Sequence, residues 1–286
     1  MGSQPDSYVL QRNTSATTRL NYQYYLWQDT FRFHLHPDIP QLAPDARIAE
    51  VATGSGIWLF DTAREVPSNI SLTGLDISLD QIPGPRGSQM PNMSFQQWSF
   101  FDAPPEDLVG KFDVVHMRLV AVVVMDQDPE KILKNVKLLL KPGGYIQWEE
   151  HYTPDAQVLT AAGVVTTEFP GLTGMRDLLA RPLNATDGSK LLGCRDWLLT
   201  LDSTMEKEGF ENVRKIIYQD SAHMGTFYTD MYATTAEEFA ELMLKRDPAL
   251  AKQLTEMISK LHEEKLTGAW VSNPKAVFLG QRSLQQ

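Results

Sequence analysis

The sequence predicts an α/β fold built on a doubly wound, Rossmann-like sheet of seven strands. Two observations favour this fold: short apolar strands alternate with helix-compatible segments, and a glycine-rich turn links the first of these strands to a helix. Strands are expected over residues 47–52, 71–75, 94–98, 112–116, 145–148, 213–218 and 276–279. Helices are expected between them over residues 57–66, 128–140 and 196–208. This order predicts parallel strands that are joined by helical crossovers.

Local signals set the ends of the predicted helices. Pro67 stops the first helix, because proline disfavours helix at the residue before it. The second helix begins at Asp128 and Pro129, a capping residue followed by proline at the first helical position, and it ends before residues 142–144. Gly209 closes the third helix, which has an apolar face at helical spacing.

The segments outside this core predict an N-terminal helical segment and two insertions. Residues 15–34 are helix-compatible and rich in aromatic side chains, and proline-containing dipeptides follow them. We therefore expect residues 1–45 to form a helical segment of their own and residues 46–286 to form one domain. Insertions are expected at about 151–192 and 219–272. In the second of these, Thr235 and Glu238 have the spacing of a capping box that opens a helix, and residues 248–266 predict another helix.

Composition excludes several classes of partner. The chain of 286 residues carries a formal charge of −10 and has no basic run, so we expect no nucleic-acid or anionic membrane partner. No apolar stretch reaches membrane-spanning length, and the N-terminus lacks the features of a signal peptide. The single cysteine, Cys194, rules out an intramolecular disulfide or a cysteine metal cluster. We expect a soluble, cytoplasmic protein that holds no metal and acts on a small molecule; the sequence allows a homodimer.

The turn from Glu50 to Gly56 predicts a cofactor site. Glycines at 54 and 56 let backbone amides approach a ligand closely, and the following helix points its N-terminus at that ligand. A dinucleotide fingerprint would need a third small residue where Leu59 stands, which disfavours a pyrophosphate. A P-loop is excluded because no Gly-Lys-Ser/Thr sequence follows. The turn therefore favours a ligand that carries adenosine without phosphates.

Acidic residues follow the next two strands. Asp76 ends the second strand, where an acidic side chain accepts hydrogen bonds from ribose hydroxyls. Asp102 follows the third strand and is expected to accept from the adenine amine, with Phe101 flanking the base. Each signal alone also fits a helix cap. Together with the glycine turn, they converge on one crevice at the carboxyl ends of the strands.

Residues 48–150 resemble the class I S-adenosylmethionine-dependent methyltransferase core of a fungal family associated with secondary-metabolite clusters. The resemblance is carried by EVATGSGIWLFDTA, LTGLDIS, FDVVHMRL, DPEKILKNVKLLLKPGGYIQWEE and, in the N-terminal helix, RLNYQYYLW. Members of this family resemble N-, O- and S-methyltransferases, including those that act on dioxopiperazine-type products. The resemblance implies S-adenosyl-L-methionine as cofactor and methyl transfer to an O, N or S atom of a small secondary metabolite.

The same resemblance assigns the site residues. It implies cofactor binding by Glu50, Thr53, Gly54, Gly56, Asp76, Ile77, Phe101, Asp102, His116 and Tyr24, and substrate binding by Tyr25, Trp27 and Glu150. His116, at the end of the fourth strand, is expected beside the sulfonium and is the first candidate for a catalytic base. Tyr24 stands where the family usually has histidine. Further candidate bases are His34, His36, Glu149, Glu150 and His151.

The resemblance implies that residues 1–45 form an N-terminal helical lid over the cofactor pocket. The stripe Tyr22, Tyr25, Trp27 and Phe31 then has two interpretations: it packs in the core, or it encloses the sulfonium or an apolar substrate through cation–π contacts and area burial. The insertions are expected to supply the rest of the substrate wall with adaptable side chains, namely Met175, Met224, Phe227, Tyr228 and Met231.

Three other functions stay open on the sequence. A related enzyme could use the bound sulfonium electrostatically, for a dehydration or pericyclic cyclisation without methyl transfer. A regulatory, non-catalytic protein could keep the same fold. A nicotinamide-dependent oxidoreductase is disfavoured by Leu59 and by the lack of a Tyr-x-x-x-Lys arrangement.

Overall fold

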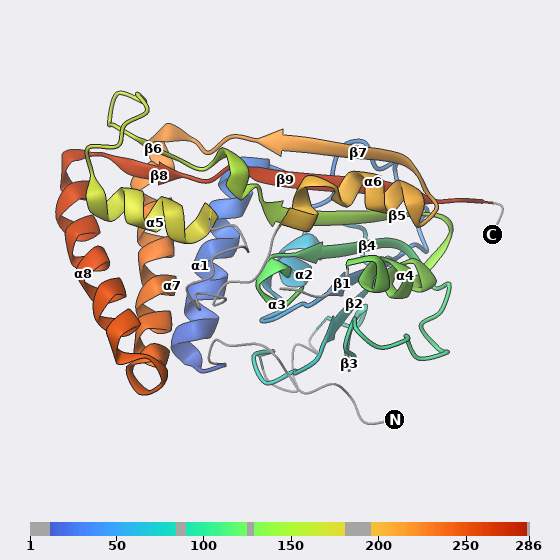
Figure 1. Cartoon of the computed structure of the whole chain (residues 1–286). Coiled ribbons are helices and arrows are strands. Elements are labelled where there is room, and N and C mark those ends of the chain that lie inside the picture. Colours follow the sequence, from blue (N-terminus) through green and yellow to red (C-terminus); the bar gives the residue numbers. More distant parts are fainter. Residues whose placement is uncertain (1–11, 84–89, 125–128, 181–195, 285–286) are drawn as a thin grey trace.

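The computed structural model of the protein describes residues 12–83, 90–124, 129–180 and 196–284. Its centre is a seven-stranded sheet with the order β3-β2-β1-β4-β5-β9-β7 (Figure 1). The strands are β1 (Arg47–Val51), β2 (Ser71–Asp76), β3 (Met93–Gln97), β4 (Phe112–Arg118), β5 (Leu140–His151), β7 (Phe210–Tyr218) and β9 (Lys275–Arg282). The first five of these strands are parallel, and β9 runs antiparallel to both β5 and β7. The chain order reverses between β1 and β4, which confirms the predicted doubly wound sheet.

Helices cover both faces of this sheet. Alternate residues of each strand point to opposite faces, so Val51 and Met117 lie in one apolar cluster while Ile48 and Val114 lie in the other. The first face is covered by α3 (Ala121–Val124), α4 (Pro129–Leu139) and α6 (Leu201–Lys207). The second face is covered by α1 (Thr14–Phe31) and α2 (Ile57–Thr62). The carboxyl ends of β1, β2, β3 and β4 meet at one edge, beside α1.

A helical block stands at one end of the sheet (Figure 1). It contains α5 (Pro170–Ala180), α7 (Gly225–Arg246) and α8 (Pro248–Glu264), with the small antiparallel pair β6 (Gln157–Leu159) and β8 (Trp270–Ser272). Short 3₁₀ turns span Thr153–Asp155, Asp196–Leu199, Ala222–Met224 and Lys265–Thr267. The first helix, α1, lies between this block and the sheet, as Figure 1 shows.

Polar contacts fasten α1 to α7. Arg19 Nε lies 2.8 Å from Glu238 Oε2, and both side chains are largely buried. The Tyr228 hydroxyl donates to the carbonyl oxygen of Leu26 at 2.9 Å and lies 2.5 Å from the Thr30 hydroxyl. Since these bonds link the start, middle and end of α1 to α7, α1 is attached to the helical block along its whole length.

The structure corrects two predicted elements. The helix expected over 196–208 is split into the 3₁₀ turn Asp196–Leu199 and α6. The capping box was wrong, because α7 begins ten residues earlier, at Gly225. Thr235 lies inside that helix, where its hydroxyl donates to the carbonyl of Met231, and Glu238 pairs with Arg19.

Other features of the insertions were not predicted. The sequence pattern gave no sign of β6, β8 or α5. Residues 181–192 of the first expected insertion, and Cys194 after it, lie outside the described residues.

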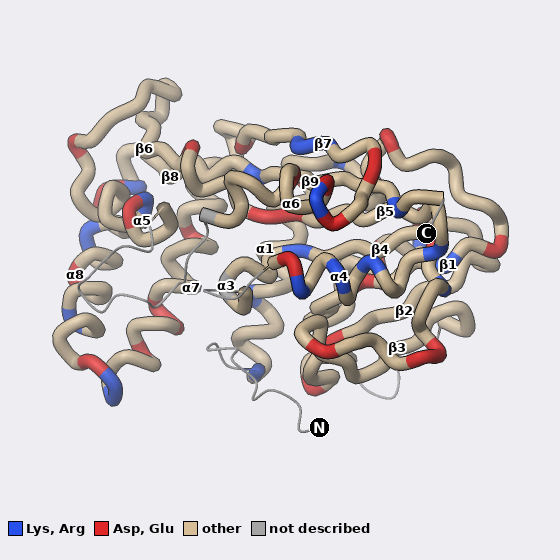
Figure 2. The backbone as a smooth tube through the Cα atoms, turned by 45° about the vertical axis from the view of Figure 1, so that its right-hand side comes forward, with Lys and Arg blue, Asp and Glu red and all other residues tan. Residues whose placement is uncertain are grey.

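Figure 2 shows basic and acidic positions interspersed along α4 and α8. In the described part of the chain, every helix is too short or too polar to cross a bilayer.

Candidate functional site

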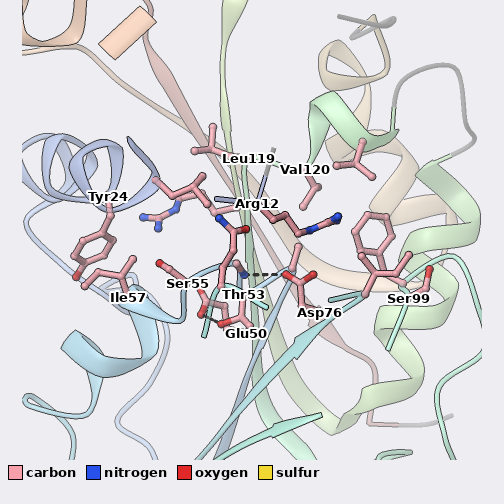
Figure 3. Close-up of a pocket in the computed structure, with 18 of the residues that line it drawn as sticks. Arg12, Tyr24, Glu50, Thr53, Ser55, Ile57, Asp76, Ser99, Leu119 and Val120 are labelled. Atoms are coloured by element: carbon pink, nitrogen blue, oxygen red, sulfur yellow. Dashed lines mark hydrogen bonds between the residues drawn. The ribbon is translucent and has the colours of Figure 1, made fainter. Parts of the chain in front are cut away.

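One pocket opens where the carboxyl ends of four strands meet α1 (Figure 3). Its walls come from α1, the turn after β1, the end of β2, the segment after β3 and the end of β4. The lining residues are Arg12, Leu20, Gln23, Tyr24, Glu50, Ala52, Thr53, Gly54, Ser55, Ile57, Asp76, Ile77, Gln81, Trp98, Ser99, Phe100, Phe101, Arg118, Leu119, Val120 and Val123. The pocket therefore lies where doubly wound sheets bind their ligands, at the switch in strand order.

The turn after β1 carries unusual backbone geometry. Ala52 and Gly54 adopt left-handed conformations with φ of 57° and 56°. This geometry aims the amide of Gly54 at Asp76, whose Oδ2 accepts from it at 2.8 Å (Figure 3). Asp76 Oδ1 accepts from the amide of Ser78 at 3.1 Å. Burial raises the pKa of Asp76, although both amide bonds favour the ionised carboxylate. The carboxylate is thus fixed at the end of β2 and faces the pocket.

Glu50 forms the floor of the turn. Its side chain is almost fully buried, and the hydroxyl of Thr53 donates to its carboxylate. Burial raises the pKa of Glu50 to about 8, in spite of this bond and the nearby Arg118 guanidinium. Gly56, also left-handed, caps α2 and packs against Phe95; it is not among the lining residues. The turn therefore offers Gly54, Thr53 and a mostly protonated carboxyl group to a ligand.

The wall after β3 is aromatic. Trp98, Phe100 and Phe101 line it, and the last two rings lie 4.6 Å apart. Ser99 adds a hydroxyl to this wall, as Figure 3 shows. Asp102 was expected here as well, but the structure does not bring it into the pocket; its amide donates to the carbonyl of Ser99. This wall suits a flat apolar ring more than a charged group.

The α1 side of the pocket holds Tyr24. Its hydroxyl lies 2.5 Å from Asp61 Oδ2 and 2.8 Å from His34 Nε2, and it accepts from Gln28 Nε2 at 2.9 Å. Burial and the Asp61 carboxylate raise the pKa of Tyr24 far above its ordinary value. The tyrosine therefore stays protonated and ties α1 to α2.

His116 lies below the pocket and does not line it. The side chain is fully buried and stacks on Trp58. Its Nδ1 is 3.8 Å from Glu50 Oε1, and its Nε2 is 3.4 Å from Glu149 Oε2. Burial lowers the pKa of His116, which favours the neutral imidazole. This placement differs from the expected position beside the reacting centre, because β4 continues two residues beyond His116, which pairs in register with Glu50 under the turn.

The expected substrate residues also lie elsewhere. Trp27 is completely buried in the core between α1 and the sheet, whereas 56% of Tyr25 is exposed. Glu150 is buried and accepts from the amides of Val120 and Ala121, so it anchors the start of α3. Its role in this structure is to position the chain that follows β4.

The remaining candidate bases are likewise outside the pocket. Glu149 accepts from Gln147 Nε2 at 2.7 Å, His36 Nε2 lies 2.9 Å from the Tyr218 hydroxyl, and His34 faces Glu65 and Tyr24. His151 contacts the ring of Trp27.

The apolar insertion residues do not reach this pocket either. Met175, Tyr228 and Met231 are buried between α5, α7 and α8, Met224 packs against them, and 47% of Phe227 is exposed.

Of the pocket residues on α1, sequence reasoning named Tyr24 and missed Leu20 and Gln23, and it missed Arg118 and Leu119 at the end of β4. Arg118 follows His116 by two positions, so strand alternation places both on the same face and could have found it. Gln23 precedes Tyr24 on α1 and had no separate signal. Leu119 could not be predicted, because its backbone is left-handed (φ 57°) and glycine, the residue that usually indicates this conformation, is absent at that position.

Comparisons with known proteins agree with this geometry. Residues 42–173 match the profile of a family described as a methyltransferase domain. The N-methyltransferase tcpN of Claviceps purpurea is 37% identical over 152 residues, which are 52% of this chain and 54% of that protein. The N-methyltransferase gliN of Aspergillus fumigatus is 28% identical over 187 residues, 63% of this chain and 62% of that protein. The chain thus spans between about half and two thirds of these relatives.

Two solved structures share the fold. A methyltransferase bound to its activator protein, from Haloferax volcanii, has a TM-score of 0.54 at 16% identity and covers 98% of this chain and 100% of that one. A phosphoethanolamine N-methyltransferase of Haemonchus contortus with bound S-adenosylhomocysteine has a TM-score of 0.51 at 13% identity, over 96% of this chain and 59% of that one. At such identities the likeness concerns the fold alone.

The fold and the site define a class I methyltransferase domain. Residues 42–173 match a methyltransferase domain, and the chain is similar to the fungal N-methyltransferases named above.

Proposed function

We propose that the protein is an S-adenosylmethionine-dependent methyltransferase that methylates a nitrogen atom of a small secondary metabolite. The observation that carries the proposal is the pairing of Gly54 with Asp76 across the ends of β1 and β2. This pairing fixes a carboxylate beside a left-handed, glycine-containing turn, and the aromatic wall after β3 completes the same pocket. The names of the relatives support nitrogen as the acceptor atom.

The pocket residues fit an adenosyl sulfonium and do not fit a dinucleotide. The place of a third glycine is filled by Leu59, which is fully buried and packs against Gly74. Asp76 would hold the ribose hydroxyls, the wall with Phe101 would hold the adenine, and Gly54 with Thr53 would hold the methionyl part.

Methyl transfer needs little acid–base catalysis from the protein. The bound cofactor supplies an activated methyl group, and the chain's own residues align the acceptor and exclude water. A neutral amine attacks with its own lone pair, whereas a hydroxyl or thiol must first lose a proton. The described residues that line the pocket include no histidine, and the raised pKa of Tyr24 keeps it protonated. The carboxyl groups of Glu50 and Asp76 are already bound by the Thr53 hydroxyl and by the amides of Gly54 and Ser78. A neutral amine, which needs no base, is therefore the nucleophile that this pocket suits best.

Isothermal titration with S-adenosylmethionine and S-adenosylhomocysteine tests cofactor binding directly. Incubation with methyl-labelled cofactor and a panel of small secondary amines and dioxopiperazines then tests transfer, with mass spectrometry of the products. We expect label in the organic product, a mass gain of one methylene unit and release of S-adenosylhomocysteine. Binding without label transfer to any amine, together with a rearranged product, would overturn the transferase function and favour a non-methylating use of the sulfonium.

A further inference from the structure

Arg118 stands out among the lining residues because no ion pair joins it to a described side chain. It ends β4, lines the pocket and is only partly buried. Within the described ranges, its guanidinium makes no hydrogen bond, and its recorded contacts are with two aromatic rings. A guanidinium carries five N–H donors in a fixed fork, so these donors stay available to a ligand in the pocket.

The guanidinium is held in place by its surroundings. It lies 5.1 Å from the ring centroid of Tyr24 and 5.6 Å from that of Trp27. Both rings are nearly inaccessible to solvent, so they form a rigid support. The backbone after Arg118 is also fixed, because the amide of Leu119 donates to the carbonyl of Glu149 at 3.0 Å. An arginine supported in this way loses little conformational freedom when it binds a ligand.

The neighbouring groups leave the positive charge free for a ligand. Glu50 is the nearby carboxyl group on the same face of the sheet, and its raised pKa keeps it mostly protonated at neutral pH. Gln23 lines the same pocket from α1, one residue before Tyr24, and no contact of its side-chain amide with a described residue is recorded. In Figure 3, Tyr24 and Asp76 lie on opposite sides of Glu50 and Thr53. The Arg118 end of the pocket is thus separate from the ribose end.

We propose that Arg118, with Gln23 beside Tyr24, forms a carboxylate-binding subsite at the α1 end of the pocket. This subsite rests on the proposed function for its place in catalysis. The carboxylate has two sources, the methionyl end of the cofactor or an acidic group of the acceptor. A planar carboxylate matches the guanidinium fork with two parallel hydrogen bonds.

The test compares ligands with and without the carboxylate. S-adenosylhomocysteine carries the methionyl carboxylate, and 5′-methylthioadenosine lacks the whole amino-acid group. Arg118→Met keeps a long side chain against the rings, Arg118→Lys keeps the charge without the fork, and Arg246→Met removes an exposed arginine at the end of α7 as a matched control. If the cofactor supplies the carboxylate, Arg118→Met weakens S-adenosylhomocysteine binding by about 10- to 100-fold and leaves 5′-methylthioadenosine unchanged. The affinity of Arg118→Lys for S-adenosylhomocysteine then lies between those of the wild type and Arg118→Met.

A second arm identifies an acceptor carboxylate. Benzoate and its neutral analogue benzamide are titrated by ligand-observed NMR, with and without S-adenosylhomocysteine. If the acceptor supplies the group, benzoate binds the wild-type protein and Arg246→Met but not Arg118→Met, and benzamide binds none of them. The proposal is overturned if Arg118→Met changes neither benzoate binding nor the affinity for S-adenosylhomocysteine relative to that for 5′-methylthioadenosine. If Arg118→Met does not fold, the same criterion applies to Arg118→Lys. Benzoate is also titrated without cofactor, so its binding can be measured even if no adenosyl ligand binds. Failure of all adenosyl ligands to bind would refute the proposed function, not the carboxylate subsite.

Discussion

The imidazole of His116 lies flat on the indole of Trp58, with ring centroids 3.9 Å apart and an interplanar angle of 7°. Both side chains are almost completely buried, and Glu50 and Glu149 flank the imidazole. This stack lies between the sheet and α2, directly under the turn that forms the pocket floor. The geometry gives His116 a supporting role for that turn.

Replacing His116 should therefore affect stability more than ligand binding. We expect His116→Gln to lower the free energy of unfolding by about 2–3 kcal/mol, because it removes the stack and leaves Glu149 with a poorer partner. Affinity of the folded variant for S-adenosylhomocysteine should stay close to that of the wild type. Urea denaturation and calorimetric titration measure the two quantities, with the exposed His262→Gln as control. Unchanged stability with lost turnover would instead show that His116 takes part in the chemistry.

The two aspartates that follow β2 and β3 should differ in their effect on cofactor binding. Asp76 lines the pocket and Asp102 does not. We expect Asp76→Asn to weaken S-adenosylhomocysteine binding by about 10- to 100-fold, because the ribose loses a charged acceptor. Asp102→Asn serves as the matched control and should bind like the wild type. Equal losses in both variants, measured by titration calorimetry, would contradict the assignment of the pocket.

Glu50 should make the ligand-free protein less stable as pH rises. Its pKa is about 8 in the folded chain and 4.5 in an ordinary environment, so the folded state holds a proton that the unfolded state releases. The favourable contribution of the protonated group is complete below pH 4.5 and is lost as pH rises to about 8. Glu50→Gln should remove this loss and gain up to a few kcal/mol over the wild type at alkaline pH. Urea denaturation from pH 5 to pH 9 measures the difference; parallel profiles would refute it.

The ion pair between Lys275 and Asp220 should be costly to break from one side. Both side chains are fully buried, and the ammonium lies 4.1 Å from the ring centroid of Tyr228. We expect Lys275→Met to destabilise the fold by about 3–5 kcal/mol, because it leaves a buried carboxylate without its partner. Adding Asp220→Asn should restore much of this loss. The exposed Lys252→Met is the control, and thermal or urea unfolding is the measurement. A double variant no better than the single one would argue against charge as the cause.

All seven strands of the large sheet were predictable because apolar runs and turn residues mark them locally. The limits of β5 were less so, since its pairing with β4 starts the strand at Leu140 and its pairing with β9 extends it to His151. The pair β6 and β8 could not be predicted, because three-residue strands carry too little pattern and are fixed by tertiary packing. The start of α7 was missed for a related reason: its buried face follows contacts with α1 and α8, not a cap in the sequence.

The strand-end residues of the pocket were easier to predict than those at its α1 end. Glycine marks a left-handed turn, and an acidic residue at a strand end is typical of a ribose site, so Gly54 and Asp76 could be named in advance. Nothing comparable marks Gln23, whose placement depends on how α1 lies across the strands, and Arg118 could be found only through strand alternation from His116. The aromatic residues of α1 share one sequence pattern, yet Trp27 is buried in the core while Tyr25 faces solvent. Helical position, not residue type, separates them.

The attachment of α1 to α7 has a kinetic consequence. Arg19 is bound to Glu238, and Tyr228 bonds to Thr30 and Leu26, so α1 cannot swing away from the pocket alone. Letting a ligand escape on that side requires either breaking a buried ion pair or moving the whole helical block as one body. Such collective displacements take microseconds to milliseconds, slower than the fluctuation of a loop. We therefore expect a ligand to enter or leave on the α1 side no faster than the helical block moves.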